Sequence, residues 1–257
     1  MLGFFLKKSF FDGWDHLFAI LLLNVGFLLS ASIGVFVPAW LGAPGWLGFC
    51  LAALAMGVGA VWWSACHFAL RRVADFGSLS FSDIPAALKE GLVPGLQVAA
   101  FLLLGYAVLT VGLPFYLRVG GVLGALAAGV IFWFSVVVVL ALQYYLPLRA
   151  RLGGGLRKNL RKSFVLFFDN PGFSVFLLIY SALNLALSLL LAFLLPGFAG
   201  VALAGNVALR LRMYKYDWLE ANPGADRRKV PWDELLKEDR DYVGKRTIKG
   251  MFFPWKE

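Results

Sequence analysis

Few side chains in the apolar segments of this sequence could do chemistry. The candidates are one imidazole and two amides, His67, Asn184 and Asn206, which fall in three different apolar stretches. Ionisable groups within a membrane usually mark ion pathways or catalysis, because an uncompensated charge is costly there. These three residues therefore form a candidate intramembrane polar site, which would serve a small transporter or a lipid-handling permease. The alternative is that each makes an ordinary hydrogen bond between helices.

A second candidate site is a cluster of four cations in the middle of the chain: Arg157, Lys158, Arg161 and Lys162. They belong to the segment Leu156–Phe168, where leucine and phenylalanine recur at helical spacing on another face. This pattern predicts an amphipathic helix in the headgroup layer, with its cations near anionic lipid. The four cations are predicted to bind membrane lipid or a protein partner.

The third candidate site is the aromatic and basic end of the chain, with Phe252, Phe253 and Trp255 as its contacts. This end belongs to a polar tail, residues 214–257, in which one short helix is predicted to open at Pro231–Glu234. The tail could bind a partner protein. We expect it instead to pack on the protein's own cytoplasmic connectors or on lipid.

Several functions are not indicated by any motif. Gly153–Gly155 follows no strand and does not match a phosphate-binding loop. The sequence has no zinc-ligand spacing and no pair of intramembrane carboxylates for acid–base catalysis. Cys50 and Cys66 have no partner motif and are expected to be small buried residues. We therefore predict a protein that is not an enzyme, with no cofactor, no metal and no nucleic-acid partner.

Composition indicates the elements that must position these residues. The chain has 257 residues, of which 60% are hydrophobic and 15% charged. Soluble domains are nearer 45–50% apolar and about 25% charged, so lipid is the expected solvent. Six segments are long and apolar enough to be predicted spans: Leu17–Val37, Trp46–Leu70, Gly95–Tyr116, Val122–Leu146, Phe173–Leu195 and Phe198–Leu211.

Charge placement predicts the orientation of these spans. With this span assignment, 23 of the 24 basic residues and all 15 acidic residues fall on one side, and only Arg118 falls on the other. Lysine and arginine are retained on the cytoplasmic side of membranes. We therefore expect a multi-pass protein of the bacterial inner membrane, with both termini in the cytoplasm.

The predicted architecture is all-α, with about six transmembrane helices arranged as three hairpins and joined by cytoplasmic amphipathic connectors. The bundle covers residues 1–213. The outer connections, Pro38–Gly45, Leu117–Gly121 and Pro196–Gly197, are short and rich in helix-breaking residues. The first fifteen residues and the connector Ser82–Leu92 are predicted to lie at the interface.

Three stretches carry a resemblance to the YesL-type family of small bacterial membrane proteins: Asp15–Leu29 with Pro38, Phe81–Leu92, and Tyr145–Arg151 with the basic helix that follows. The resemblance covers about residues 1–213 and not the charged tail. It implies an accessory role near a carbohydrate-uptake system, and it assigns no role to individual residues.

Together these patterns favour a non-enzymatic accessory or scaffold protein that binds a partner, with a transporter as one candidate. A small transporter or lipid-handling permease that uses an intramembrane cleft is the alternative. The first hypothesis depends on the cationic and aromatic surfaces, and the second depends on the polar site.

Overall fold

The computed structural model describes residues 1–227 and 229–246, and every regular element in these ranges is a helix. In chain order the elements are α1 (Leu2–Asp15), α2 (Leu17–Leu41), α3 (Gly45–Ala74), η1 (Phe81–Asp83), α4 (Ile84–Ala107), η2 (Val108–Gly112), α5 (Leu113–Val119), α6 (Gly121–Leu142), α7 (Tyr145–Leu152), α8 (Leu156–Asp169), α9 (Pro171–Leu190), α10 (Gly197–Ala221), α11 (Trp232–Leu235) and α12 (Lys237–Val243). η1 is a 3₁₀ helix, and η2 is a π-helical turn. The all-α prediction is confirmed.

Five helices in the described ranges are long and apolar enough to cross a membrane, as a polytopic membrane protein requires. They are Leu17–Leu41, Gly45–Ala74, Phe81–Val119, Gly121–Leu152 and Pro171–Leu190. The sixth predicted span, Phe198–Leu211, lies inside α10, which is not among them. From Gly197 to Leu209, α10 runs for about 20 Å before its first arginine, whereas the hydrocarbon layer is about 30 Å thick.

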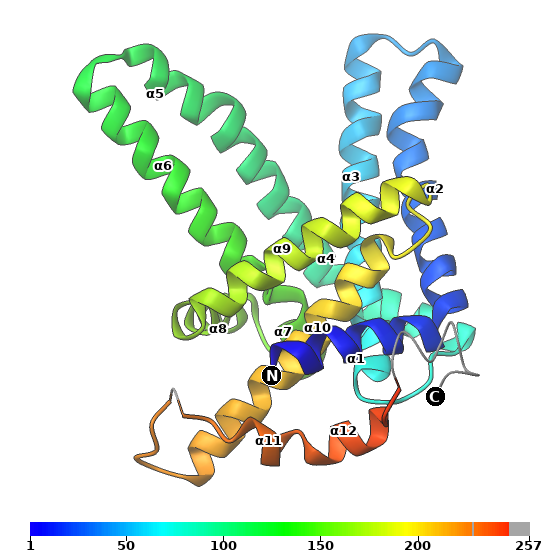
Figure 1. Ribbon diagram of the computed structural model, residues 1–257. Helices are drawn as coiled ribbons and strands as arrows, with labels where there is room; N and C mark the ends of the chain where they lie inside the picture. The colour runs from blue at the N-terminus through cyan, green and yellow to red at the C-terminus, as the bar shows by residue number, and fades with distance from the viewer. Residues whose placement is uncertain (228, 247–257) are drawn as a thin grey trace.

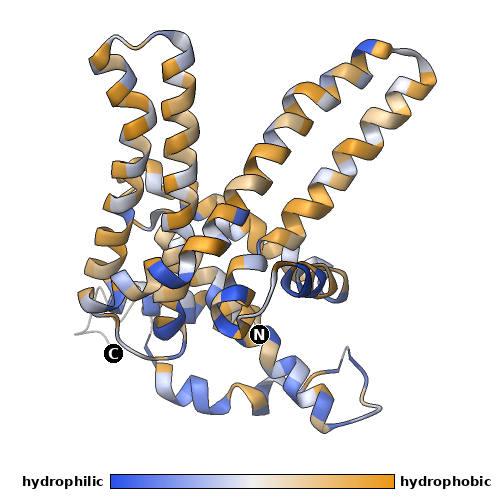
Figure 2. Ribbon diagram, turned by 180° about the vertical axis from the view of Figure 1, so that it is seen from behind, coloured by the Kyte–Doolittle hydropathy of each residue, from blue (hydrophilic) through white to orange (hydrophobic). Residues whose placement is uncertain are grey.

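Two long hairpins rise from one side of the molecule and diverge from each other (Figure 1). One consists of α2 and α3, and the other of the continuous helix α4–η2–α5 together with α6. Figure 2 shows that both hairpins are mostly apolar, whereas polar residues gather around α1, α8, α11 and α12. We call this polar end the basic side, and the end with the hairpin tips the far side.

Small residues bring the hairpin helices into close contact. Gly95 of α4 lies directly on α3, where an added Cβ would stand 2.4 Å from the Cα of Val61. Gly124 of α6 lies against the carbonyl of Tyr116 and so allows the tight α5–α6 turn. In both places glycine lets two helices approach closely.

Helix α10 forms the centre of the bundle. It packs against α1, α2, α3, α7 and α9, and every residue from Ala202 to Leu209 is buried. Alanine and glycine dominate this stretch because so many neighbouring helices approach it at once.

The turn between α9 and α10 lies well short of the far side, so the prediction of an outer connection at Pro196–Gly197 is wrong. Asn24 of α2 binds this turn: its Nδ2 donates to the carbonyls of Leu194 (3.0 Å) and Pro196 (2.8 Å), and its Oδ1 accepts the N–H of Ala199 (2.9 Å). Asn24 lies about 10 Å from the start of α2, and the helix continues for about 25 Å beyond it. In Figure 1, α9 is oblique and its turn lies below the hairpin tips. The α9–α10 hairpin therefore enters the apolar layer without reaching the far side.

The amino-terminal helix α1 has the predicted helical structure, but it is docked on the protein. Phe5 is fully buried, and its ring meets those of Phe173 and Tyr180 edge to face at 5.8 and 5.1 Å. The connector predicted at Ser82–Leu92 forms most of η1 and the start of α4, with Pro85 in the first turn of α4. It runs on into the membrane helix instead of forming a separate interfacial helix.

The described part of the tail packs on the basic side, as expected. α10 continues past the predicted boundary at residue 213 to Ala221, and two short helices replace the single predicted one because Leu236 interrupts the helical conformation. Leu236 is fully buried in the main core. The amino group of Lys7 donates to the carbonyl of Gly244 (2.8 Å), and Arg246 makes a two-bond ion pair with Asp15.

The position of the α9–α10 turn can be tested by cysteine labelling in a background with Cys50→Ser and Cys66→Ala. We expect a membrane-impermeant maleimide to label Gly45→Cys and Arg118→Cys from the far side only. Ala192→Cys is exposed on the fold but lies within the apolar layer, so it should react from neither side. Labelling of Ala192→Cys from the far side would contradict the partial insertion of this hairpin.

Candidate functional site

The four cations predicted as a binding surface lie on α8 and have no side-chain partner among the described residues. Arg157, Lys158 and Arg161 are exposed, and Lys162 is half-buried. None of them takes part in an ion pair, a side-chain hydrogen bond or a cation–π contact within residues 1–227 and 229–246. Eight other cations do have an aspartate partner: Lys8, Arg72, Arg151, Arg210, Lys215, Arg227, Arg240 and Arg246. The α8 cluster is therefore available to an anion outside the chain.

The buried face of α8 is rotated from the predicted one. The helix has the predicted extent, but Asn159 and Ser163 are buried together with Leu166 and Phe167, whereas Leu156 is exposed. Asn159 donates to the carbonyl of Gly153 (2.7 Å) and so ties the start of α8 to the preceding loop. The periodicity of the apolar residues missed this face because these polar side chains satisfy local backbone groups instead of facing water.

The three residues of the candidate intramembrane polar site are bonded within the protein and do not form a common site. His67 of α3 and Asn206 of α10 are both buried, and the Nδ2 of Asn206 lies 3.4 Å from the Nδ1 of His67 and donates to the carbonyl of His67 at 3.1 Å. Asn184 is not joined to them, since its amide donates to the carbonyl of Tyr180 in its own helix. Neither of the two cavities described below is lined by any of the three residues. The geometry favours interhelical bonding over a solute pathway.

The predicted aromatic contacts Phe252, Phe253 and Trp255 lie outside the described residues.

Arg210 connects four elements on the basic side. Its guanidinium donates to Asp75 after α3 (2.8 Å) and to Asp239 of α12 (2.9 Å), and Arg151 of α7 also donates to Asp75 (2.7 Å). The hydroxyl of Tyr214 donates to Asp239 at 3.1 Å. This network fixes the tail helix to the membrane bundle through charge-assisted hydrogen bonds.

Lys8 and Asp12 form a buried ion pair on α1, with 2.8 Å between the amino group and the carboxylate. Lys8 also lies over the ring of Phe76, 3.3 Å from its centroid. Burial lowers the pKa of Lys8 and raises the pKa of Asp12, and in each case the partner's charge only partly offsets this. The pair is therefore costly to break from either end.

A second polar network joins α8 to α10 through Asp169 and Asn170. Lys215 donates to Asp169 and Asn170 at 2.9 Å each, and Tyr216 donates to Asp169 at 2.7 Å. Arg212 donates to Asn170 at 2.8 Å. Burial acts to raise the pKa of Asp169, but the hydrogen bonds from Lys215 and Tyr216 and the nearby charges outweigh it, so this pKa is lowered. Asp169 therefore stays ionised and holds α8 against the centre of the bundle.

Sequence reasoning missed these networks because their members are far apart in the chain. Only Lys8 and Asp12 carried a local signal, since they are four residues apart in a segment rich in phenylalanine. Asp75 and Asp239 lie 164 residues apart and meet only through Arg210. No periodicity or motif predicts such a meeting.

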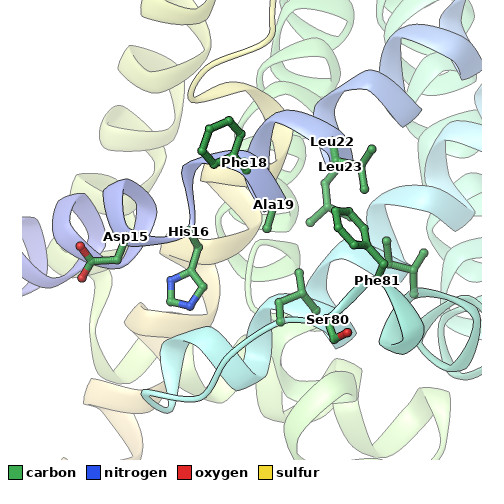
Figure 3. A pocket seen from close by; sticks show the side chains of 10 residues that line it. Asp15, His16, Phe18, Ala19, Leu22, Leu23, Ser80 and Phe81 are labelled. Carbon is green, nitrogen blue, oxygen red and sulfur yellow. The ribbon is translucent and has the colours of Figure 1, made fainter.

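One cavity lies near the basic side, and a larger one extends along the second long hairpin. The smaller, of about 220 Å³, lies between the α1–α2 junction and the loop before α4, with Asp15 and His16 at one end and Phe81 at the other (Figure 3). Its polar groups are already bonded, since Asp15 pairs with Arg246 and the Nδ1 of His16 lies 3.0 Å from the carbonyl of Asp12. The larger, of about 850 Å³, is an apolar groove between α6 and α8.

No protein-family model, curated protein or solved structure matches this chain. The resemblance to the YesL-type family therefore stays a prediction from three stretches of sequence.

The role of Asn24 can be tested against Asn184, a second asparagine in an apolar helix. Asn24→Leu should lower the midpoint of thermal unfolding by several degrees, because two carbonyls and one N–H in the α9–α10 turn lose their partner, at about 1–3 kcal/mol for each buried group. Asn184→Leu should stay near wild type, since it removes only a bond to a carbonyl of its own helix. Intrinsic fluorescence of the purified protein during heating measures both midpoints. An equal loss in the two variants would show that Asn24 does not hold the turn.

The Lys8–Asp12 pair predicts an asymmetric response to substitution. Lys8→Met leaves a buried carboxylate without its partner and should lower the free energy of unfolding by about 3–5 kcal/mol at neutral pH. The double variant Lys8→Met/Asp12→Leu should regain most of this loss, because no charge then remains buried. The deficit of the single variant should shrink as the pH falls toward the raised pKa of Asp12, at which the carboxyl becomes neutral. Denaturant titration followed by fluorescence checks these values, and a double variant as unstable as the single one would contradict the pairing.

Proposed function

We propose that this chain is a non-enzymatic accessory or scaffold protein of the bacterial inner membrane, with both termini in the cytoplasm. The orientation is supported by the placement of charge. Among the described residues, Arg118, near the tip of the second long hairpin, is the only charged residue assigned to the far side, and the other described cations are assigned to the basic side.

The observation that carries the proposal is the second long hairpin. We call its outer part, residues 108–134, the arm. Helix α5 packs mainly on α6 and η2, and the arm stands apart from the α2–α3 hairpin (Figure 1). Most of its side chains are exposed, with Val111, Leu117 and Leu123 at 67%, 61% and 82% exposure. Such a two-helix projection offers an extended apolar surface that the chain itself does not cover.

The occupant we propose for this surface is a transmembrane helix of a partner membrane protein. Gly105 and Gly112 flank the start of the arm, and an added Cβ on either would meet no atom within 4 Å. Small residues on an open helix surface let a second helix approach closely. The π-helical turn between them, at Val108–Gly112, is of a kind frequently found at functional positions.

The body of the molecule suits a scaffold, because ion pairs on its basic side join α10 to α8 and α12, and Lys7 of α1 donates to the carbonyl of Gly244 after α12. A rigid base would hold the arm at a fixed angle toward a partner. The family resemblance suggests a transporter for carbohydrate uptake as that partner. The alternative of a small transporter or permease has no comparable support, since Asn206 is hydrogen-bonded to His67 and both side chains are buried.

Affinity purification in mild detergent with quantitative mass spectrometry tests this function. The wild-type protein should enrich a specific membrane protein, and Gly105→Leu/Gly112→Leu should reduce that enrichment at least about fivefold, because leucine keeps a partner helix away from the arm. Gly57→Leu is the matched control, since Gly57 lies on the other hairpin and is equally open. Equal enrichment by all three proteins, or no membrane protein above background, would refute the proposal.

A further inference from the structure

The larger cavity is a groove along α6 of the second hairpin, from near the tip of this hairpin to its base on the basic side. Its wall on α6 runs from Ala125 to Val137, and Phe164 and Phe168 of α8 line its end on the basic side. No lining side chain is charged, and the indole nitrogen of Trp133 is the only polar side-chain atom among them. An occupant of the groove must therefore be apolar along this length.

The groove has the dimensions of one lipid chain. Ala125 and Gly129 lie one helical turn apart and form a shallow floor, because an added Cβ on Gly129 would meet no atom within 4 Å. Leu126 and Val130 stand beside this floor with more than half of their surface exposed. The distance along α6 from Ala125 to Val137 is about 18 Å, close to the depth of about 15 Å for one leaflet.

Two of the unpaired cations, Arg157 and Arg161, follow the groove at its end on the basic side. Arg157, Arg161, Phe164 and Phe168 follow one another at spacings of four, three and four residues and so share one stripe of α8. Lys158 and Lys162 lie about a quarter of a turn or more from that stripe. The phenylalanines line the groove, and the arginines follow them on the same side of the helix.

We propose that this groove and the arginine stripe together bind one phospholipid with an anionic headgroup. One acyl chain lies along α6 over Ala125 and Gly129, and the phosphate accepts hydrogen bonds from Arg157 and Arg161. Both guanidinium groups are exposed and have no anion within the described part of the chain, so the lipid supplies the missing countercharge. This site goes beyond the proposed partner contact, which is centred on Gly105 and Gly112 of the other helix of this hairpin and does not use the arginines.

Native mass spectrometry of the delipidated protein in detergent tests the site. The probes are phosphatidylglycerol and phosphatidylcholine with identical acyl chains, titrated against four proteins: wild type, Arg157→Gln/Arg161→Gln, Lys158→Gln/Lys162→Gln and Gly129→Leu. Both double variants lose the same two charges, and Gly129→Leu fills the floor of the groove without changing charge. Ala125→Leu is a second filling variant, and unchanged thermal midpoints establish that each protein is folded.

Wild type should bind one phosphatidylglycerol in preference to phosphatidylcholine. The arginine variant should bind phosphatidylglycerol on the order of tenfold more weakly, and the lysine variant less than about threefold more weakly. The groove-filling variants should weaken both lipids alike. Equal losses in the two double variants would mean a diffuse charge effect and would overturn the site. Unchanged binding in both filling variants, or capture of an acidic protein segment instead of lipid, would also overturn it.

Discussion

A cation in a low-dielectric interior needs an anion or a hydrogen-bond acceptor beside it, and α10 carries three such cations at the base of the bundle. Arg210, Arg212 and Lys215 point in different directions from a helix that is surrounded on most sides. Arg210 pairs with Asp75 and Asp239. Lys215 pairs with Asp169, and Arg212 donates a hydrogen bond to Asn170. The loop after α3, the end of α8 and the tail helix are therefore placed by α10, and their positions follow from the need to neutralise it.

The same constraint acts on the backbone inside the apolar layer. A turn there exposes carbonyl and N–H groups that lipid cannot satisfy, so irregular backbone occurs at this depth only where protein covers it. Asn24 provides two donors and one acceptor to the α9–α10 turn, and α2 is thereby fixed next to α10. The indole of Trp62 donates to the carbonyl of Leu23 (2.8 Å) and draws α3 to the same place. Below this level the helices form one body, and above it the two long hairpins diverge.

The sequence was sufficient for the helices, because long apolar runs and helix-breaking turns depend only on local composition. The segments α2, α3, α6 and α8 all begin within a few residues of their predicted starts. The depth of the α9–α10 turn was not predictable in the same way. Hydropathy assigned Phe198–Leu211 to a span, but the deciding group is Asn24, about 170 residues away. For the candidate site, the sequence singled out the four cations of α8 as a prediction, whereas their lack of anionic partners among the described residues emerges only from the folded chain.

Positive charge can set the topology of a membrane protein or bind a ligand, and the two uses look alike in a sequence. The lack of anionic partners distinguishes them. Loop cations set the topology whatever they touch, since orientation follows their number and placement. Once the chain is folded, Lys8 of α1 and Arg210 and Lys215 of α10 are held in internal ion pairs. Arg157 and Arg161 are left over, and they lie in line with the only phenylalanines that α8 contributes to the groove. A binding role is better inferred from charges that the fold leaves unpaired than from the density of charge in a segment.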